Sequence, residues 1–364
     1  MTDDRKFLFA HKVTESAFSR ALSARVDEYF ARTRQSPRAN AHMIFKTLFG
    51  VVAWIATYVW LLTGDFTPLQ VVGVYVVHGF AQLHMGLNIA HDANHGAYAR
   101  NARVNRLLGC AFDLVGLSSY MWRLMHNDAH HIFVNVRGAD TALVSGHLFR
   151  FSPHDERRPF HRFQHLYAPA LYCLSTLDWV FAKDYRWLIT VHRYGNRQVI
   201  RHPAGEIVFL FAAKAFYYTY TLVIPLVFLS VPWWAIVTGF VAMHACLGFT
   251  LALTFQPNHF TGESDFPEPD EDGHVSNNYI RHIFDTTVDY ARGNPLAQWA
   301  LGGLNLHTAH HMFPHVCHVH YPALTRIIKA TAEEHGLRYR ENRSIAGAFL
   351  AHLRWIRALG QEGT

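Results

Sequence analysis

Charged side chains are scarce in this chain, which argues against a soluble domain. Asp, Glu, Lys and Arg make up 16% of its 364 residues, while hydrophobic residues make up 50%. Soluble proteins typically carry about 25% charged residues, so the composition favours a membrane protein. The net charge of +6 suits contact with anionic lipid head groups or with an acidic protein partner. The usual excess of Lys and Arg on the cytoplasmic side of membrane proteins explains it equally well.

Cysteine is also scarce, and its spacing excludes a disulfide framework. The four cysteines, Cys110, Cys173, Cys246 and Cys317, are far apart and form no Cys-x-x-Cys pair. Because Cys246 falls within an apolar stretch, we expect reduced thiols. The first residues, Met-Thr-Asp-Asp-Arg-Lys, contain no apolar core, so we do not expect them to form a secretory signal.

Long apolar runs, in contrast, are frequent. A helix needs about 20 apolar residues to cross the ~30 Å hydrocarbon core of a bilayer. Four segments reach this length: residues 44–62, 69–90, 207–230 and 233–255. Because the connection within each pair is short, the sequence predicts two helical hairpins, and thus an all-α integral membrane protein with four transmembrane helices. Two further apolar stretches, 107–124 and 166–182, each contain one aspartate. We expect interfacial helices there, or shallow re-entrant segments.

Basic residues predict the orientation of these spans. Arg32, Arg34 and Arg38 precede the first span, whereas its exit loop carries only the acidic Asp65. The positive-inside rule therefore places both termini and the arginine-rich central segment in the cytoplasm. We expect one membrane-bound domain over residues 1–364. Its parts are an N-terminal cytosolic segment (1–43), a first hairpin (44–90), a cytosolic and interfacial part (91–206), a second hairpin (207–255) and a C-terminal cytosolic part (256–364).

Three histidine clusters lie beside the predicted spans, all on the cytoplasmic face. They read His91-Asp-Ala-Asn-His95, His126-Asn-Asp-Ala-His130-His131 and His307-Thr-Ala-His310-His311. Neutral imidazole is the commonest protein metal ligand, and residues three or four apart share one face of a helix. Adjacent residues point about 100° apart on a helix, so the doubled histidines can serve different ions. Eight imidazoles exceed what one ion needs, and the sequence therefore predicts a site for two metals.

Other histidines carry weaker signals. His161 and His165 repeat the four-residue spacing, but we expect a surface or interfacial pair there. His78, His84 and His244 lie inside spans, where we expect hydrogen bonds to the interior of the helix bundle. Three more follow the third cluster and are expected to make outer contacts: His315, His318 and His320.

Ligand type alone does not decide the metal, because imidazole suits Zn, Cu, Fe and Ni. A zinc-protease interpretation of His91-Asp-Ala-Asn-His95 leaves six histidines unused. A carboxylate-bridged di-iron bundle requires Glu-x-x-His pairs on helices, and the sequence has only Glu271–His274, in an acidic loop. A membrane haem protein with His84 and His244 as axial ligands leaves the three clusters unexplained.

With its clusters in this order, the chain resembles the integral-membrane fatty acid desaturase family over about residues 40–330. The flanking residues are similar to the branch that contains linoleoyl-CoA and front-end desaturases. They read His91-Asp-Ala-Asn-His95-Gly-Ala-Tyr, Trp122-Arg-Leu-Met-His126-Asn, Gly302-Gly-Leu-Asn-Leu-His307 and His310-His311-Met-Phe-Pro, the last continuing to Cys317-His-Val-His-Tyr-Pro.

The resemblance implies a cytosolic helical cap over four spanning helices, with two iron ions held between the clusters. The implied metal ligands are His91, His95, His126, His130, His131, His259, His307, His310 and His311. Among these, His259 in Gln256-Pro-Asn-His259 is the best match for a further family histidine after the last span. Asn135 matches another family position, and we expect it to shape the surroundings of the ligands together with Asp92 and Asn305.

The activity implied by the resemblance is O2-dependent desaturation of a fatty acyl chain, with O2 as co-substrate. The acyl chain is carried by CoA, by acyl carrier protein or by a lipid, and the electrons come from an external donor of the ferredoxin or cytochrome b5 type. The resemblance further implies a surrounding lipid bilayer, the inner membrane in a bacterium, and no nucleic-acid partner.

Two departures from the family pattern matter. The third cluster begins with His307 where front-end members usually have Gln, so front-end regiochemistry does not follow. His202-Pro-Ala-Gly205 imitates the His-Pro-Gly-Gly of a fused cytochrome b5 domain, but it runs directly into the third span. Three alternatives stay open: hydroxylation, epoxidation or acetylenation by the same centre, a haem electron-transfer protein, and a zinc-dependent membrane hydrolase.

Overall fold

The structure is a computed structural model that describes residues 6–144, 147–191 and 193–361, and it is mainly helical. The helices in chain order are α1 (Ala17–Thr33), α2 (Ala41–Thr63), α3 (Pro68–His84), α4 (His91–Asn94), α5 (Ala102–Gly109), α6 (Ala111–Leu114), α7 (Ser119–Met125), α8 (Gln164–Asp178), α9 (Asp184–Thr190), α10 (Ala204–Tyr218), α11 (Ile224–Phe228), α12 (Trp233–His259), α13 (Tyr279–Thr286), α14 (Pro295–Ala300), α15 (His307–Met312), α16 (Tyr321–Glu334) and α17 (Ile345–Gln361).

Four π-helical turns interrupt or extend these helices, at Met85–Ala90, His126–His130, Trp179–Lys183 and Thr219–Val223. Strands are short and pair in twos. β1 (Leu8–Phe9) runs parallel to β4 (His274–Val275), β2 (Arg193–Tyr194) antiparallel to β3 (Arg197–Gln198), and β5 (Asp289–Tyr290) parallel to β6 (Glu341–Asn342). The prediction of a helical protein is therefore confirmed.

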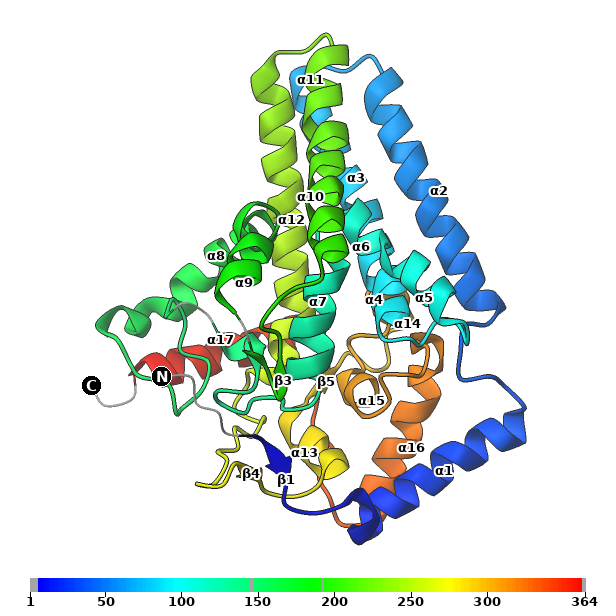
Figure 1. Ribbon diagram of the computed structural model, residues 1–364, viewed down its shortest axis with the longest axis vertical. Helices are drawn as coiled ribbons and strands as arrows, with labels where there is room; N and C mark the ends of the chain where they lie inside the picture. The colour runs from blue at the N-terminus through cyan, green and yellow to red at the C-terminus, as the bar shows by residue number, and fades with distance from the viewer. Residues whose placement is uncertain (1–5, 145–146, 192, 362–364) are drawn as a thin grey trace.

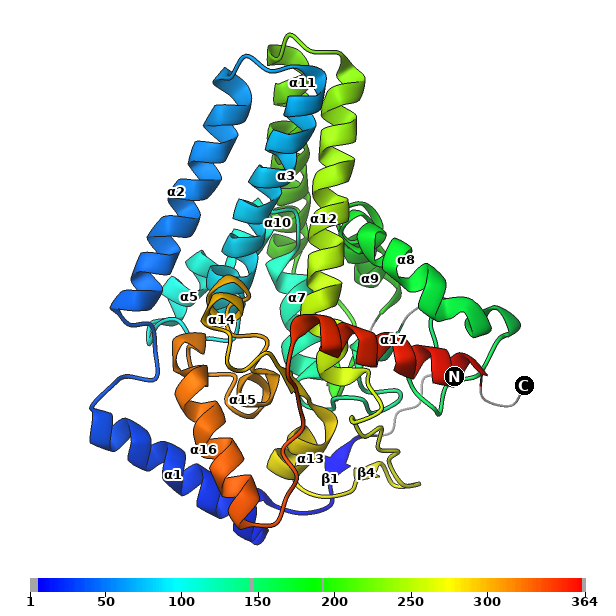
Figure 2. The same ribbon diagram turned by 180° about the vertical axis from the view of Figure 1, so that it is seen from behind.

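The long helices α2, α3, α10 with α11, and α12 stand side by side in one half of the molecule (Figures 1 and 2). Within the part of the chain that the structure describes, three helical stretches are long and apolar enough to cross a membrane: Ala41–Thr63, Ala204–Phe228 and Trp233–His259. Three of the four predicted spans thus recur, with ends shifted by a few residues. The largest shift extends the last helix from residue 255 to His259, which carries that histidine out of the bundle.

The remaining predicted span, 69–90, forms α3 and the π-helix Met85–Ala90. This segment is less apolar than the other three, because it carries polar side chains. His78 and His84 are among them; both are buried between helices and have partners there. His78 contacts the Thr57 hydroxyl at 2.9 Å, and His84 contacts the Lys46 carbonyl oxygen at 3.0 Å. Thr67, which caps α3, and Pro68 at its first turn fix where the helix begins.

The two interrupted apolar stretches are broken into short helices around the lower ends of the long ones. Residues 107–124 hold the end of α5, all of α6 and most of α7, while 166–182 lie in α8 and the π-helix that follows it. The aspartate in the first stretch, Asp113, is buried and accepts a hydrogen bond from the Ser119 amide. α8 packs along α12.

The opposite half of the molecule, which we call the compact half, contains α1, α13, α15, α16 and α17 (Figure 1). Its core joins α1, α13 and α16 through buried aliphatic and aromatic side chains. They include Leu22, Val26, Ile283, Phe284, Leu324 and Ile328. α15, which carries the third histidine cluster, lies above this core, between the two halves (Figure 2).

A buried ion pair joins α10 to the segment after α8. Lys214 Nζ lies 2.8 Å from Asp184 Oδ2, and both side chains are almost fully buried. The ammonium also donates to the carbonyl oxygens of Gly116 and Val180, and the carboxylate accepts from the Ser118 amide. Both charged groups of this pair are therefore stabilised by hydrogen bonds to the backbone, and a buried ion pair is stable only with such additional bonds.

We predict that Lys214→Met destabilises the protein by about 3–5 kcal/mol, because Asp184 would be left buried without its cation. The thermal unfolding midpoint in detergent measures this. Arg186→Met is the control, since Arg186 pairs with Asp178 at 3.1 Å on the surface, where such pairs contribute about 0–1 kcal/mol. Equal shifts for the two variants would contradict the prediction.

Candidate metal centre

The three histidine clusters sit on helices that end or begin at the same level of the molecule. His91 opens α4 directly after the π-helix Met85–Ala90, and the second cluster itself forms the π-helix His126–His130. His307, His310 and His311 all lie on α15. Extra residues in a helical turn rotate the side chains that follow, and π-helical turns are frequent at functional sites for this reason.

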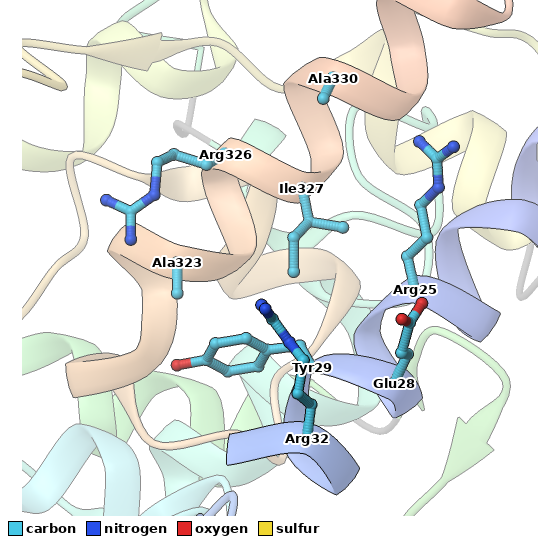
Figure 3. A pocket seen from close by; sticks show the side chains of 8 residues that line it. All are labelled: Arg25, Glu28, Tyr29, Arg32, Ala323, Arg326, Ile327 and Ala330. Carbon is cyan, nitrogen blue, oxygen red and sulfur yellow. The ribbon is translucent and has the colours of Figure 1, made fainter.

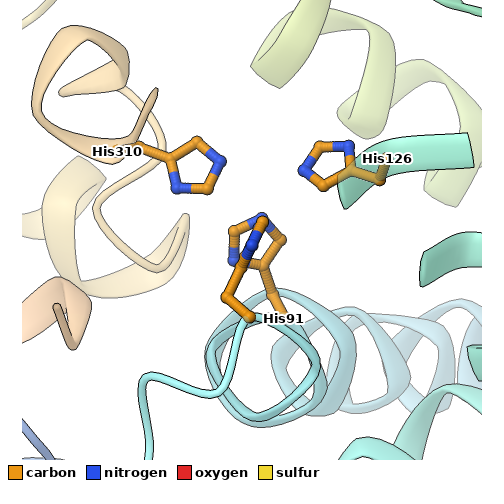
Figure 4. A group of neighbouring side chains, drawn as sticks. His91, His126 and His310 are labelled. Carbon is orange, nitrogen blue, oxygen red and sulfur yellow. The ribbon is translucent and has the colours of Figure 1, made fainter. Parts of the chain in front are cut away.

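Four histidines form a first group: His91, His95, His126 and His310. One ring nitrogen from each lies within 4.8 Å of those of the other three. Figure 4 shows the rings of His91, His126 and His310 converging from three separate elements. Three of the four side chains are buried, and His126 is partly exposed. The segments that hold them are up to 219 residues apart in sequence.

Four further histidines form a second group, fully buried: His130, His259, His307 and His311, again within 4.8 Å of one another. His131 lies between the groups. Its Nε2 is 2.9 Å from the Nε2 atoms of both His126 and His310, and its ring stacks on His311 with centroids 4.0 Å apart. The structure thus brings together all nine histidines that the sequence singled out. His310 belongs to the first group and His311 to the second.

The tautomers of the second group can be worked out from its outer contacts. His307 Nδ1 lies 3.0 Å from the Leu304 carbonyl oxygen, and His259 Nδ1 lies 3.3 Å from that of Thr286. A carbonyl oxygen only accepts, so both rings carry their proton on Nδ1. Their Nε2 atoms then both present lone pairs, yet they lie 2.8 Å apart. Two such lone pairs do not form a hydrogen bond with each other, whereas a cation between them would bind both.

Several buried nitrogens of the first group have no hydrogen-bond partner among the described residues. They are both ring nitrogens of His91 and Nε2 of His95. Buried polar atoms rarely lack a hydrogen-bond partner. Two nitrogens bound to one ion at about 2.0–2.1 Å lie roughly 3 Å apart when they subtend a right angle. The contacts of 2.9 Å from His131 to His126 and His310, and those of 2.8 and 3.1 Å within the second group, fit this spacing.

Burial keeps most of these rings neutral. Burial, and after it the neighbouring imidazoles, lower the pKa of six of them well below the usual 6.5: His95, His126, His131, His307, His310 and His311. Water cannot stabilise an imidazolium there, and each ring repels a charge on the next. The neutral form is also the form that binds metals.

A carboxylate that the sequence did not point to supports the second group. Asp140 Oδ1 accepts from His130 Nδ1 at 2.9 Å, and the Asn135 amide donates to Oδ2 at 2.8 Å. Burial would raise the pKa of Asp140, but the adjacent His130 and these hydrogen bonds hold it below its ordinary value. Asn135 has φ +59° and also donates to the His259 carbonyl oxygen. Its expected position around the ligands is therefore what the structure shows.

A buried network of hydrogen bonds lies next to the first group. His318 Nδ1 lies 2.8 Å from Asp92 Oδ2, and Lys46 Nζ lies 2.7 Å from the other ring nitrogen, His318 Nε2. All three side chains are buried, and Asp92 Oδ1 is 3.8 Å from His91 Nδ1. Asp92 thus binds His318 through one carboxylate oxygen and lies beside the proposed ligand His91 with the other. Of the other outer residues, Asn305 donates to the Tyr290 carbonyl oxygen, and His315 Nδ1 contacts that of His95.

The remaining histidines are engaged elsewhere. His244 contacts the Tyr217 hydroxyl at 3.0 Å and the Thr176 hydroxyl at 3.1 Å, while His84 contacts the Lys46 carbonyl. These contacts occupy the nitrogens that a haem iron would require. The expectation for His161 was wrong. It is not on the surface but 1% exposed, because α17 covers it, and it accepts a hydrogen bond from the Arg158 amide.

An apolar pocket adjoins the first group on the side of the long helices. Its walls come from α3 and the π-helix after it, from residues 112–117 and from α12, and they include Leu83, Gly86, Leu87, Phe112, Val115, Leu247 and Leu251. Phe112 contacts Trp122 with ring centroids 5.0 Å apart, and Trp122 stacks on His126 at 4.2 Å. One aromatic pair therefore separates this pocket from the histidines.

Comparison with known proteins gives consistent matches. Residues 66–343 match a family model described as fatty acid desaturase. The chain is 33% identical to the sn-1 linoleoyl-lipid 6-desaturase of Arthrospira platensis, over 94% of this chain and 92% of that protein. It is 32% identical to a protein of the same name from Synechocystis sp., over 94% and 96%. It is 30% identical to the acyl-lipid (8-3)-desaturase of Physcomitrium patens, over 94% and 72%.

We predict that His310→Ala removes bound metal, since His310 belongs to the first group and contacts His131. His161→Ala should keep its metal but lower the free energy of unfolding by about 1–3 kcal/mol, because it leaves buried polar groups without partners. Metal analysis of both purified variants, with thermal denaturation alongside, tests the pair. Loss of metal in both, or in neither, would show that the two histidines do not differ in role.

Proposed function

This chain belongs to the fatty acid desaturase family and is a fatty acyl desaturase; on that premise, we propose that it works through an O2-dependent di-iron centre. We assign the first ion to His91, His95, His126 and His310, and the second to His130, His259, His307 and His311. His131, in contact with both groups, completes the set. The single observation that carries this proposal is the pair of buried all-imidazole groups beside one apolar pocket.

The residues fit such a centre. Burial keeps rings such as His307 and His310 neutral, and the ring nitrogens of each group converge. Carbonyl oxygens face Nδ1 of His307 and His259, and Asp140 faces Nδ1 of His130. Contacts of this kind raise ligand basicity and fix ring orientation. Imidazole also suits zinc and copper, and family membership is what favours iron. When bound, the iron pair would supply the oxidising power that removes two hydrogens from adjacent methylenes while O2 is reduced to water.

The protein's own part is to place the acyl chain and exclude water. Unactivated methylenes offer no polar handle, so the apolar pocket must position them by shape alone. Leu83, Leu87 and Phe112 enclose it, and Trp122 faces His91, His95 and His126 at its inner end. A methylene pair held next to Trp122 would lie beside the first histidine group. The proposed reaction requires no general base.

We further propose that α2, α3, α10 with α11, and α12 all span the bilayer as two hairpins, with the compact half and both termini in the cytoplasm. The polar side chains of α3 are turned toward neighbouring helices, which makes a fourth span compatible with its composition. The outer face of α2 exposes large apolar side chains along its length, among them Phe45, Leu48, Val52, Ile55 and Val59. Arginines before α2 support the orientation.

The relatives named above act on lipid-linked acyl chains by name, and we propose a lipid-linked substrate here, ahead of acyl-CoA and acyl carrier protein. Electrons would come from a separate ferredoxin or cytochrome b5. Hydroxylation or acetylenation by the same centre differs only in the fate of the oxidised chain, and product analysis separates these outcomes.

The test is reconstitution of the purified protein with iron in liposomes that contain acyl-lipids, followed by reduction in air and fatty acid profiling. We expect about two irons per chain, new double bonds, and no product without O2 or reductant. Bound zinc with hydrolysed lipid under anaerobic conditions would overturn the proposal in favour of a hydrolase. Hydroxylated product would overturn only the reaction outcome.

Gly86 offers a way to test the pocket. A Cβ at this position would meet Phe112 at 3.6 Å, an ordinary contact, so Gly86→Ala should fold and keep activity. Gly86→Leu would fill the space that the acyl chain needs and should lower turnover by about tenfold or more, with iron content unchanged. Equal activities of the two variants on the same lipid would contradict the assignment of this pocket.

A further inference from the structure

We propose that the groove between α1 and α16 is the docking site for an acidic one-electron carrier protein. This inference rests on the proposed function. In that reaction, R–CH2–CH2–R′ + O2 + 2 H⁺ + 2 e⁻ gives R–CH=CH–R′ + 2 H2O. Two carrier molecules are each oxidised by one electron for every double bond formed, and the groove is where each of them would bind.

The groove is a basic pocket of about 470 Å³ on the compact half (Figure 3). Arg32 on α1 and Arg326 on α16 are exposed, and neither has an ion-pair partner among the described residues. Arg25 pairs with Glu334 at 2.5 Å, and Glu28 is the acidic side chain in the lining. Two unpaired guanidinium groups flank an apolar floor of Tyr29 and Ile327, an arrangement that complements acidic groups around an apolar centre.

The position of the groove favours a protein from the aqueous phase over a lipid. α1 and α16 lie at the end of the molecule opposite the tips of the long helices (Figures 1 and 2). The apolar pocket that we assign to the acyl chain lies on the other side of the histidines, among α3 and α12. A lipid head group that belongs to the acyl chain would therefore not reach Arg32 or Arg326.

A path of aromatic rings, with one step along the backbone, leads from the groove to the first histidine group. Tyr29, in the floor, packs edge-on against Phe30 with centroids 5.0 Å apart, and Phe30 packs against His320 at 5.4 Å. The next residue, Tyr321, is buried, and its hydroxyl lies 3.1 Å from His310 Nδ1. The Tyr29–Phe30 and Phe30–His320 rings are close to van der Waals contact, and the backbone joins His320 to Tyr321, so every step of this path is short. The groove is thus electronically connected to a proposed metal ligand.

The test measures turnover of the iron-loaded protein with acyl-lipid vesicles and two donors, a plant-type [2Fe–2S] ferredoxin and a soluble cytochrome b5 domain. R32E and R326E should each raise KM for at least one carrier by about tenfold at low salt, with a weaker effect as salt screens the groove. Phe30→Leu should lower kcat with that carrier and leave its KM unchanged, since it opens the ring chain without altering the surface.

R354E is the matched control, because Arg354 is exposed on α17, away from the groove (Figure 2), and it should leave KM within about twofold. Reduced methyl viologen, which needs no docking, should support all four variants equally. If no reductant yields product with the unaltered protein, the proposed function fails. If methyl viologen works but neither carrier does, or R32E acts like R354E, or R32E raises KM for the lipid instead, the docking site is overturned.

Discussion

The constraint on which the site depends is the repulsion between imidazole lone pairs that face one another without water. His259 and His307 point unprotonated Nε2 atoms at each other across 2.8 Å, because carbonyl oxygens hold their protons on the far nitrogens. Protonation cannot relieve the repulsion, since burial and the adjacent rings lower the pKa of His307. Only a cation offers both nitrogens a favourable partner. The outer carbonyls and Asp140 thus do more than pack, because they select the tautomer that turns the Nε2 lone pairs toward one another.

Local helix geometry positions the imidazole rings of the two groups. The π-helices at Met85–Ala90 and His126–His130 alter the helical repeat where the first two clusters begin, and α12 runs past the bundle to bring His259 to the same level. Adjacent histidines diverge, so that His310 and His311 serve opposite groups from one short helix. An ordinary helix through the second cluster would place His126 and His130 on one face, whereas here they belong to different groups.

Much of this could be predicted from the sequence, because the clusters and apolar runs are local patterns. The spacing of the histidines identified the three clusters, and the resemblance to the family added His259 to the expected metal ligands. Contacts between segments that are distant in sequence could not be predicted. Nothing local to Asp140 marks it as the partner of His130, and Lys46 reaches His318 across 272 residues. His161 misled because its cover, α17, comes from the far end of the chain. The partners of the polar residues of α3, Thr57 and the Lys46 carbonyl, likewise lie on another helix.

The spread of the ligands along the chain has a consequence for biogenesis. The first group needs His91 and His310, and the second needs His130 and His311, so neither can close until nearly the whole chain has left the ribosome. On the proposed metal assignment, the long helices are therefore synthesised before the metal can be bound, and a metal-free precursor precedes the mature enzyme. A cell short of iron would then accumulate that precursor.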